Sequence, residues 1–406
     1  QGDRNVPLEE MRVAPDDAVM QIGPTTIRNL ELVRCSADNK RRGSLLHLLD
    51  RTRTAMGGRL LQQWLLYPRL DLSEIQVRHE RVNALVARPA IREELRSALD
   101  GVRDLERLTT RVLTQIATPR DLAALAMSLD RIPPIQALLT DSDSMTLREL
   151  AQGLDPVVEA AAAIRETLVD EPPPTLKDGG VIKEGFDADL DEWIRIGREG
   201  KAWFLEYAEA LRRETEITSL KIRYNQVFGY FIEVTKANLH RVPDTFLRKQ
   251  TLANSERYYT PELKEYEEKV LSAQDRRVSL ELALFENLRQ SLAAHADRIR
   301  ATARHLAAVD VLAGLADLAH RQRYVRPEMH EGSEIALEDA RHPVIETLMP
   351  AGEFVPNDLH LDAETRQLVV ITGPNMSGKS TIMRQVALAA IMAQMGSFVP
   401  AASARI

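Results

Sequence analysis

A glycine-rich segment near residue 375 carries the residue types that bind phosphate. It reads Gly373-Pro374-Asn375-Met376-Ser377-Gly378-Lys379-Ser380-Thr381 and matches the pattern G-x-x-x-x-G-K-[ST]. The glycines allow a tight turn in which backbone N–H groups converge on phosphate oxygens. The lysine adds a positive charge for the β- and γ-phosphates, and the Ser380 hydroxyl is suited to Mg²⁺. We therefore predict that residues 373–381 bind ATP and Mg²⁺, with Ser380 as the metal ligand.

The segments on either side of this loop are those that would position it. Gln367–Thr372 is a short apolar run typical of a buried strand, and Lys379–Met395 is predicted to be a helix. A helix that begins at Lys379 points the positive end of its dipole at the bound phosphates. A strand, a glycine-rich turn and a helix in this order predict the start of an α/β ATPase domain.

Rapid ATP hydrolysis needs two further groups, an acidic strand end for Mg²⁺ and a residue that orients water. Only 25 residues follow Thr381, and Val399–Ile406 contains no acidic residue. We therefore predict no catalytic residue in this chain and expect it to be a poor ATPase by itself.

Residues 218–258 are distinctive because they are both basic and aromatic. They contain seven basic and three acidic residues and six of the 19 aromatic residues of a chain whose formal charge is −7. Most of these aromatic side chains are expected to fill the core of a small domain. A basic strand face favours sequence-independent contact with the DNA backbone, and Lys221, Arg223 and Asn225 would share such a face. The predicted DNA contacts are Lys221, Arg223, Asn225, Lys236, Arg248, Lys249, Gln250, Thr251, Asn254 and Arg257.

The periodicity of the remaining sequence predicts two helical regions around this basic segment. Apolar residues recur at helical intervals from residue 45 to 168 and again from 190 to 211, with a Pro- and Gly-rich break at 171–180. Residues 220–225 and 230–235 alternate and predict a β-hairpin. From 262 to 313 there are 52 residues without Pro or Gly, which as one helix would extend roughly 78 Å. We expect one helix to lead out to the strands and a long one to return, with the charged residues 262–269 on a solvated face.

Composition excludes several classes of protein. The chain of 406 residues is 44% hydrophobic and 28% charged, which excludes wholesale disorder and favours several domains. Its longest apolar runs, 368–372 and 386–395, fall short of the ~18 residues that a membrane span needs, so we expect no membrane partner. A single cysteine, Cys35, excludes a disulfide framework, and no secretory leader opens the sequence. We expect a reducing, cytoplasmic location.

Five further stretches are more specific than any single motif: Asp50–Leu61, Asn225–Ile232, Arg248–Leu252, Tyr258–Val270 and Ala340–Pro343. Together with a phosphate loop that contains Pro-Asn-Met, they resemble the MutS family of DNA mismatch-repair ATPases, in order and over essentially the whole chain. That family usually has glycine at the position of Ser377, where another small residue should keep the loop.

The resemblance implies a mainly α multidomain fold. It would have a helical core, long lever helices, a small β-rich DNA clamp inserted at the lever tip, and the start of a P-loop α/β ATPase domain. The corresponding boundaries are a connector tail at 1–15, core at 16–185, outgoing lever helix at 186–217, clamp at 218–261, returning lever helices at 262–323 and truncated ATPase domain at 324–406.

The resemblance also implies roles for residues and partners. Phe354 would stack on the adenine, Asn375, Lys379 and Ser380 would meet phosphate and Mg²⁺, and the clamp residues would contact the DNA backbone. The implied partners are mismatch-containing double-stranded DNA, a second copy of the protein and a MutL-type repair protein, near the nucleoid in the cytoplasm. The family's mismatch-reading domain, its acidic metal-binding strand, its signature loop that acts in trans and its dimer-forming carboxyl-terminal part are not recognised, so we expect the middle of such a protein.

Two other interpretations remain open. One is a chromosome-maintenance ATPase with a coiled-coil arm, although that arm would follow the phosphate loop, whereas here the long helices precede it. The other is a DNA-binding module whose nucleotide site is vestigial.

Overall fold

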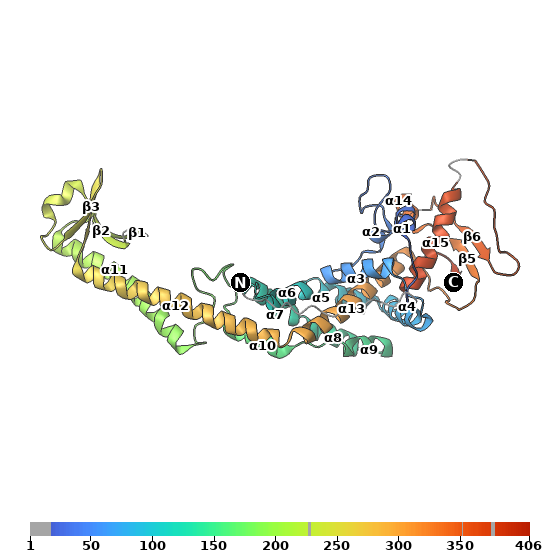
Figure 1. Cartoon of the computed structure of the whole chain (residues 1–406), viewed down its shortest axis with the longest axis horizontal. Coiled ribbons are helices and arrows are strands. Elements are labelled where there is room, and N and C mark those ends of the chain that lie inside the picture. The colour runs from blue at the N-terminus through green and yellow to red at the C-terminus, as the bar shows by residue number, and fades with distance from the viewer. Residues whose placement is uncertain (1–17, 226–228, 351, 375–377) are drawn as a thin grey trace. The chain divides into compact units, whose positions relative to one another are not determined.

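The computed structural model describes residues 18–225, 229–350, 352–374 and 378–406. Internal contacts divide the chain into two compact units, whose elements are labelled in Figure 1. Among the described residues, unit 1 comprises positions up to 116, 124–161 and 292–406, and unit 2 comprises 117–123 and 162–291.

The first part of the chain is a series of short helices, as its apolar pattern predicted. They are α1 (Pro24–Asn29), α2 (Leu45–Leu49), α3 (Ala55–Leu66), α4 (Leu72–Val86), α5 (Pro89–Leu99), α6 (Leu105–Leu113), α7 (Pro119–Leu129), α8 (Ile132–Thr140), α9 (Met145–Gln152) and α10 (Val158–Thr167). Polar N-cap residues fix the first residue of several of these helices. Thr54 accepts a hydrogen bond from the Gly57 N–H at α3, and Asp71 accepts one from Glu74 at α4.

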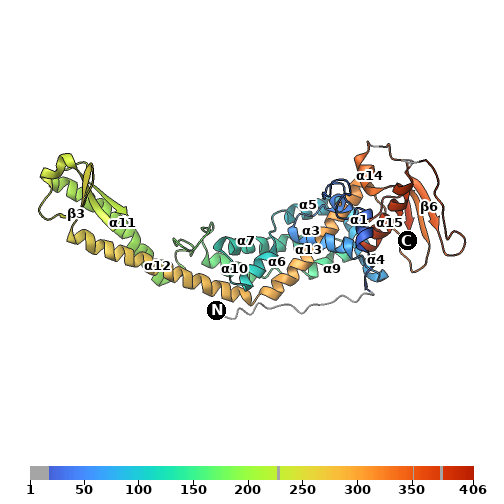
Figure 2. The same ribbon diagram turned by 45° about the horizontal axis from the view of Figure 1, so that its top comes forward.

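Unit 1 is built around α13 (Ala296–Gln322), which packs against α2 to α6. Figure 2 shows α13 running among these short helices. Every residue from Val309 to Ala319 is buried, which fits a helix that is enclosed on all sides rather than one with a solvated face. The core of unit 1 therefore lies along this helix.

Unit 2 consists of two long helices and a small antiparallel sheet. The chain passes through α11 (Ala188–Thr215), β1 (Lys221–Asn225), β2 (Gly229–Thr235), the 3-10 helix η2 (Lys236–Arg241), β3 (Leu247–Thr251), β4 (Ser255–Tyr259) and α12 (Pro261–Ala293). The strand order is β1-β2-β4-β3. Figures 1 and 2 both show α11 and α12 side by side, with the strands at one end of the pair. The predicted hairpin and the predicted order of helix, strands and returning helix are confirmed.

The long stretch without Pro or Gly forms two helices rather than one. α12 ends at Ala293 and α13 begins at Ala296, after a turn that includes His295. The 33 residues of α12 extend roughly 50 Å. The absence of Pro and Gly permits a long helix but does not prevent a turn that tertiary packing favours.

The remaining part of unit 1 contains a three-stranded antiparallel sheet and the predicted helix Lys379–Met395. Its elements are β5 (Ile335–Ala340), α14 (Pro343–Leu348), β6 (Asn357–Leu361), α15 (Lys379–Met395) and β7 (Ser403–Arg405), with strand order β6-β5-β7. Both predicted ends of α15 are confirmed, and its flanking residues Gly378 and Gly396 have positive φ angles of 89° and 97°.

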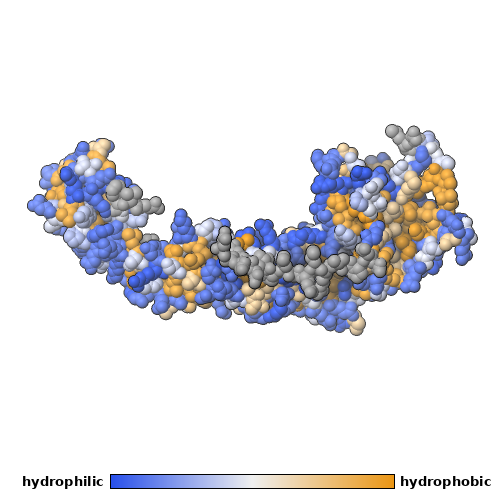
Figure 3. Space-filling model, viewed as in Figure 1, coloured by the Kyte–Doolittle hydropathy of each residue, from blue (hydrophilic) through white to orange (hydrophobic). Residues whose placement is uncertain are grey.

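The prediction of a buried strand at Gln367–Thr372 was wrong. None of these residues is in a strand, and Leu368 and Val370 are 83% and 74% exposed. A buried strand needs neighbours on both sides, and within the described residues the sheet of this region is β6-β5-β7, which does not include the run. Figure 3 shows hydrophobic surface in this part of unit 1.

One helical stretch of the described residues, Pro119–Thr140, is long and apolar enough to cross a membrane by length and composition alone. It forms two helices, α7 and α8, which are separated at Asp130–Arg131. α8 packs against α5 and α9, and Ile132, Ile135 and Leu139 are buried. These features are typical of core helices in a globular protein.

Candidate functional site

The sheet of unit 2 brings predicted DNA contacts from three of its strands, β1, β3 and β4, into one row with Glu233 of β2. The register pairs Lys221 of β1 with Glu233 of β2, Glu233 with Arg257 of β4, and Arg257 with Gln250 of β3. Residues directly opposite one another in an antiparallel sheet point to the same face. Arg223 lies two residues from Lys221 and therefore on that face too. We call Lys221, Arg223, Gln250 and Arg257 the basic face.

Short contacts hold these side chains in place. Arg223 Nε lies 3.3 Å from Glu233 Oε2, and Ser255 Oγ donates to the other carboxylate oxygen of Glu233. Arg257 Nη1 donates to Gln250 Oε1 at 2.7 Å, and its guanidinium carbon lies 4.3 Å from the centre of the Phe231 ring. Arginines held in this way lose less side-chain freedom when they bind a phosphate. The single carboxylate leaves the face cationic.

The other predicted DNA contacts do not all share this face. Asn225 does, because it lies two residues beyond Arg223 on β1. Arg248 pairs in register with Tyr258 and so points to the opposite face, where its guanidinium is 3.9 Å from Glu256. An irregularity in the β3–β4 register between positions 248 and 250 separates it from Gln250. Asn225 is half-buried at the end of β1. Thr251 pairs in register with Glu256 and so points to the opposite face, whereas Lys249 Nζ lies 5.7 Å from the centre of the Tyr259 ring. Lys236 begins η2, and Asn254 lies in the turn between β3 and β4.

The aromatic residues divide as expected between core and surface. Phe231, Phe246 and Tyr258 are buried, whereas Tyr224 is 50% exposed. Burial and a hydrogen bond to Glu256 raise the pKa of Tyr258 to about 12, so it remains a neutral donor. Phe228 lies outside the described residues.

Glu267 anchors the start of β2, and sequence reasoning missed it. Its carboxylate is buried on α12, accepts the Tyr230 N–H at 2.9 Å and pairs with Lys264 Nζ at 2.8 Å. Gly229 has a φ of 68°, and a Cβ there would lie 1.6 Å from Glu267 Oε1. The prediction that residues 262–269 form a solvated face was therefore wrong for Glu267. A signal was present in the stretch Tyr258–Val270, which carries the family resemblance.

The structure describes residues 373–374 and 378–381, at the two ends of the phosphate loop. Lys379 opens α15, and its Nζ donates to the carbonyl oxygens of Gly373 and Pro374 at 2.6 and 2.5 Å. The left-handed Gly378 precedes it, Ser380 is exposed in the first turn, and Thr381 is half-buried. The predicted contacts Asn375, Met376 and Ser377 lie outside the described residues. Phe354 is half-buried between α14 and β6, and its contact with adenine stays a prediction.

These residues fit a phosphate group. A helix that begins at a left-handed glycine presents its first N–H groups, and a lysine at that point adds a full positive charge. Ser380 could supply one oxygen to Mg²⁺, and phosphate oxygens would supply others. Among the described residues, no group of three or more His, Cys, Asp or Glu side chains could hold a metal ion.

The other end of α15 is fixed to α4 within unit 1. Arg78 Nη1 donates to the Met395 carbonyl at 2.9 Å, and Arg78 stacks on Trp64 with its guanidinium 3.7 Å from the ring centre. Beside it, His79 is buried and meets the Phe398 ring edge-on at 6.4 Å. The helix that carries Lys379 is therefore anchored firmly at its far end. Nothing in the sequence pattern indicated these contacts.

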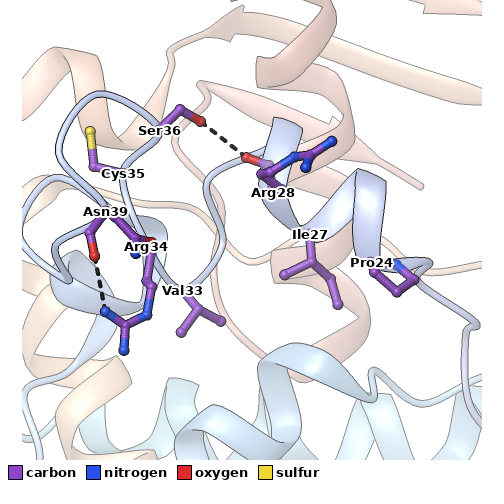
Figure 4. Close-up of a pocket in the computed structure, with 8 residues that line it drawn as sticks. All are labelled: Pro24, Ile27, Arg28, Val33, Arg34, Cys35, Ser36 and Asn39. Carbon is purple, nitrogen blue, oxygen red and sulfur yellow. Dashed lines mark hydrogen bonds between the residues drawn. The ribbon is translucent and has the colours of Figure 1, made fainter.

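A cavity of about 440 Å³ lies elsewhere in unit 1, where α1 and the following loop meet (Figure 4). It is lined by Pro24, Ile27, Arg28, Val33, Arg34, Cys35, Ser36 and Asn39. Two of its polar side chains already donate hydrogen bonds to backbone carbonyl oxygens. Ser36 Oγ donates to the Arg28 carbonyl, and Arg34 Nη1 donates to the Asn39 carbonyl. None of the predicted site residues lines it, and we assign it no role.

Comparison with known proteins identifies a family for these elements. Residues 25–316 match the family model described as MutS domain III, and residues 369–406 match MutS domain V. The DNA mismatch repair protein MutS of Symbiobacterium thermophilum is 50% identical over 387 residues. Proteins of the same name from Syntrophobacter fumaroxidans and Lactobacillus delbrueckii are each 47% identical, over 387 and 388 residues. These alignments cover 95% of this chain and 44–45% of each relative, so the chain spans less than half the length of the relatives.

Proposed function

Because the chain belongs to the MutS family, we propose that it acts in DNA mismatch repair as the part that contacts the DNA backbone and binds ATP with Mg²⁺. In this proposal residues 218–261 are the clamp, α11 and α12 form the lever, and residues 324–406 begin the ATPase domain. The protein would work in the cytoplasm as part of a homodimer that meets mismatched DNA and a MutL-type partner. Nucleotide binding would alter the conformation of the clamp. The strength of this effect is the coupling free energy between the nucleotide site and the DNA site.

The row of side chains across the sheet is the observation that carries the DNA part of the proposal. Lys221, Arg223 and Arg257 surround a single carboxylate, Glu233, on one face of a rigid sheet. Such a face recognises regularly spaced phosphates and carries no information about base sequence. The basic face would therefore grip duplex DNA equally well with and without a mismatch, and mismatch discrimination would belong to other parts of a MutS protein.

The salt dependence of DNA binding tests this proposal. Changing Lys221 and Arg223 together to glutamine should lower the slope of log Kd against log salt by about 1.8, because each lost phosphate contact contributes roughly 0.9. Arg195→Gln with Arg198→Gln is a matched control, since both arginines are exposed on α11 and pair with nearby glutamates. Fluorescence anisotropy with one duplex at several salt concentrations would measure both. An unchanged slope in the first variant, or an equal fall in the control, would remove the basic face from the DNA-binding surface.

Nucleotide binding is tested separately at the start of α15. Lys379→Ala should weaken binding of a fluorescent ATP analogue by at least roughly tenfold, because it removes the charge that faces the β- and γ-phosphates. Ser380→Ala should instead reduce the gain in affinity that Mg²⁺ produces and leave Mg²⁺-free binding near that of the parent chain. If both variants bound nucleotide as the parent does, with the same response to Mg²⁺, the vestigial-site interpretation would replace this one.

A further inference from the structure

A groove in unit 2 lies between one stripe of α11 and the first strand of the sheet. Its volume is about 500 Å³. It is lined by Phe204, Leu205, Ala208, Arg212, Lys221, Ile222, Arg223 and Tyr230. Among the lining residues that belong to α11, Leu205, Ala208 and Arg212 are three to four positions apart, so they lie on one side of this helix. We call this hollow the α11–β1 groove.

The groove has an apolar, well-supported floor. The rings of Phe204 and Tyr230 stack with centres 4.0 Å apart, and Phe204 is buried. Leu205 at the rim is 72% exposed, and Tyr224 on the neighbouring strand is 50% exposed. Large apolar side chains grouped at a hollow in this way mark a binding surface more often than isolated exposed ones do. The space suits an aliphatic or small aromatic side chain.

The strand beside the groove is at the edge of its sheet. β1 comes first in the order β1-β2-β4-β3, so within the described residues its one strand partner is β2. In an antiparallel edge strand, alternate backbone N–H and C=O groups point away from the sheet and can pair with another extended chain. An edge strand next to a helix-lined apolar groove is the arrangement that peptide-binding domains use for strand addition.

The charges around the groove select the kind of peptide. Its lining contains three cationic residues, Arg212, Lys221 and Arg223, and no carboxylate. Arg212 Nε donates to the Leu220 carbonyl at 2.7 Å, which fixes its charge beside the start of β1. Acidic side chains of a bound segment would meet these cations, whereas a basic or neutral segment would gain nothing from them.

We propose that the α11–β1 groove binds an extended, acidic segment of a partner protein, which adds as a strand to β1 and inserts an apolar side chain between Leu205 and Tyr230. This is a protein-binding surface that shares Lys221 and Arg223 with the basic face, and it goes beyond the DNA and nucleotide contacts proposed above. A peptide fits the site better than single-stranded DNA does, because a peptide backbone can pair with the edge of β1.

The test uses the complete chain and a panel of fluorescent ten-residue peptides in which leucine, valine or phenylalanine alternates with aspartate or glutamate. Anisotropy should reveal binding by members of the panel. Replacing two alternate residues of the best peptide with proline should weaken it roughly tenfold or more, because proline removes N–H donors. Leu205→Asp should weaken the same peptide to a similar extent. Leu282→Asp, the same change at a 45% exposed leucine of α12, should have no effect.

Duplex DNA provides the second readout. Because Lys221 and Arg223 also line the groove, the uncharged variant Leu205→Asn is used here: it should lose the peptide as Leu205→Asp does but bind a duplex as the parent chain does, so that lost peptide binding cannot be ascribed to unfolding of the sheet. The inference would be overturned if no peptide bound the parent more tightly than the Leu205→Asp variant, or if the proline peptide bound equally well. It would also be overturned if a single-stranded oligonucleotide displaced the peptide and lost its own affinity in the uncharged Leu205→Asn variant, since the groove would then be a nucleic-acid site.

Discussion

Replacing Asp310 with alanine should destabilise unit 1 strongly, because this buried carboxylate joins α13 to the segment that begins α3. It accepts the N–H groups of Arg53 and Thr54, each at 2.8 Å, and the Thr54 hydroxyl at 2.7 Å. Burial raises the pKa of Asp310, although these hydrogen bonds act in the opposite direction. A Cβ on Gly57 would lie 2.3 Å from Asp310 Oδ2, so the glycine is what allows this close approach. The stretch Asp50–Leu61 thus has a structural reason for its composition.

The expected loss follows from the groups that would be left without partners. Removing the carboxylate leaves two backbone N–H donors at a buried site, each costing about 1–3 kcal/mol, and loosens the Thr54 cap of α3 by about 1 kcal/mol. Part of this loss is offset because the variant no longer has to bury the charge of the Asp310 carboxylate. We expect Asp310→Ala to lower the unfolding free energy of unit 1 by about 3–5 kcal/mol. Asp310→Asn should lose about 2 kcal/mol, because one oxygen can still accept.

Hydrogen exchange of peptides from α3 and α13, measured by mass spectrometry, would report the opening free energy of unit 1 separately from that of unit 2. Asp297→Ala is the control, since Asp297 is exposed on the same helix and its replacement should change stability by no more than about 0.5 kcal/mol. Asp310→Asn being as stable as the parent, or more so, would refute the reasoning. Such a result would mean that the desolvation of the charge outweighs the hydrogen bonds it receives.

Two other substitutions probe unit 2 and the junction at α15. Gly229→Ala should lower the stability of unit 2 and weaken DNA binding, because its Cβ would collide with Glu267. The control Gly185→Ala is also at positive φ but has open space around it, so it should lower the unfolding free energy by only about 1–2 kcal/mol. Hydrogen exchange of β2 would compare the two variants. Burial lowers the pKa of His79 from 6.5 to about 4, so the unfolded chain binds the proton first and stability falls as pH drops from about 6.5 to 4. Urea unfolding should show that the unfolding free energy falls by about 2 kcal/mol from pH 7 to pH 5. The His79→Leu variant should not show this fall.

The parts of the fold that were predictable from sequence are those governed by local rules. Both ends of α15 were predicted correctly, and in the structure each end is bounded by a glycine in the left-handed conformation, Gly378 before the helix and Gly396 after it. The hairpin of β1 and β2 was predicted because alternation of apolar and polar residues has few other interpretations. The row of Lys221 and Arg223 on one face followed from the same alternation.

The errors come from contacts between residues that are far apart in the chain. Glu267 lies among other charged residues of α12, so helical periodicity predicted a solvated position for it. Its burial depends on the Tyr230 N–H, 37 residues earlier, which no local pattern reveals. Arg248 and Gln250 were predicted as DNA contacts without an assignment to a face; a register irregularity places them on opposite faces of the sheet, and their contact with DNA stays a prediction. Gln367–Thr372 has the composition of a strand, and strand formation also requires a neighbour.

Buried carboxylates on α12 explain how unit 2 holds its loops. Glu267 accepts the N–H of Tyr230 at the start of β2, and Glu281, also buried, accepts the N–H groups of Gly180 and Val181 at 3.0 and 2.7 Å. Each carboxylate is paired with a cation one turn away on the same helix, Lys264 or Arg277. Tyr230 and Val181 each follow a glycine with positive φ, Gly229 or Gly180, so the backbone can approach α12 closely at both places. Glu267 therefore fixes the start of β2 on α12, and its substitution would alter the proposed DNA contact although Glu267 is not part of the basic face.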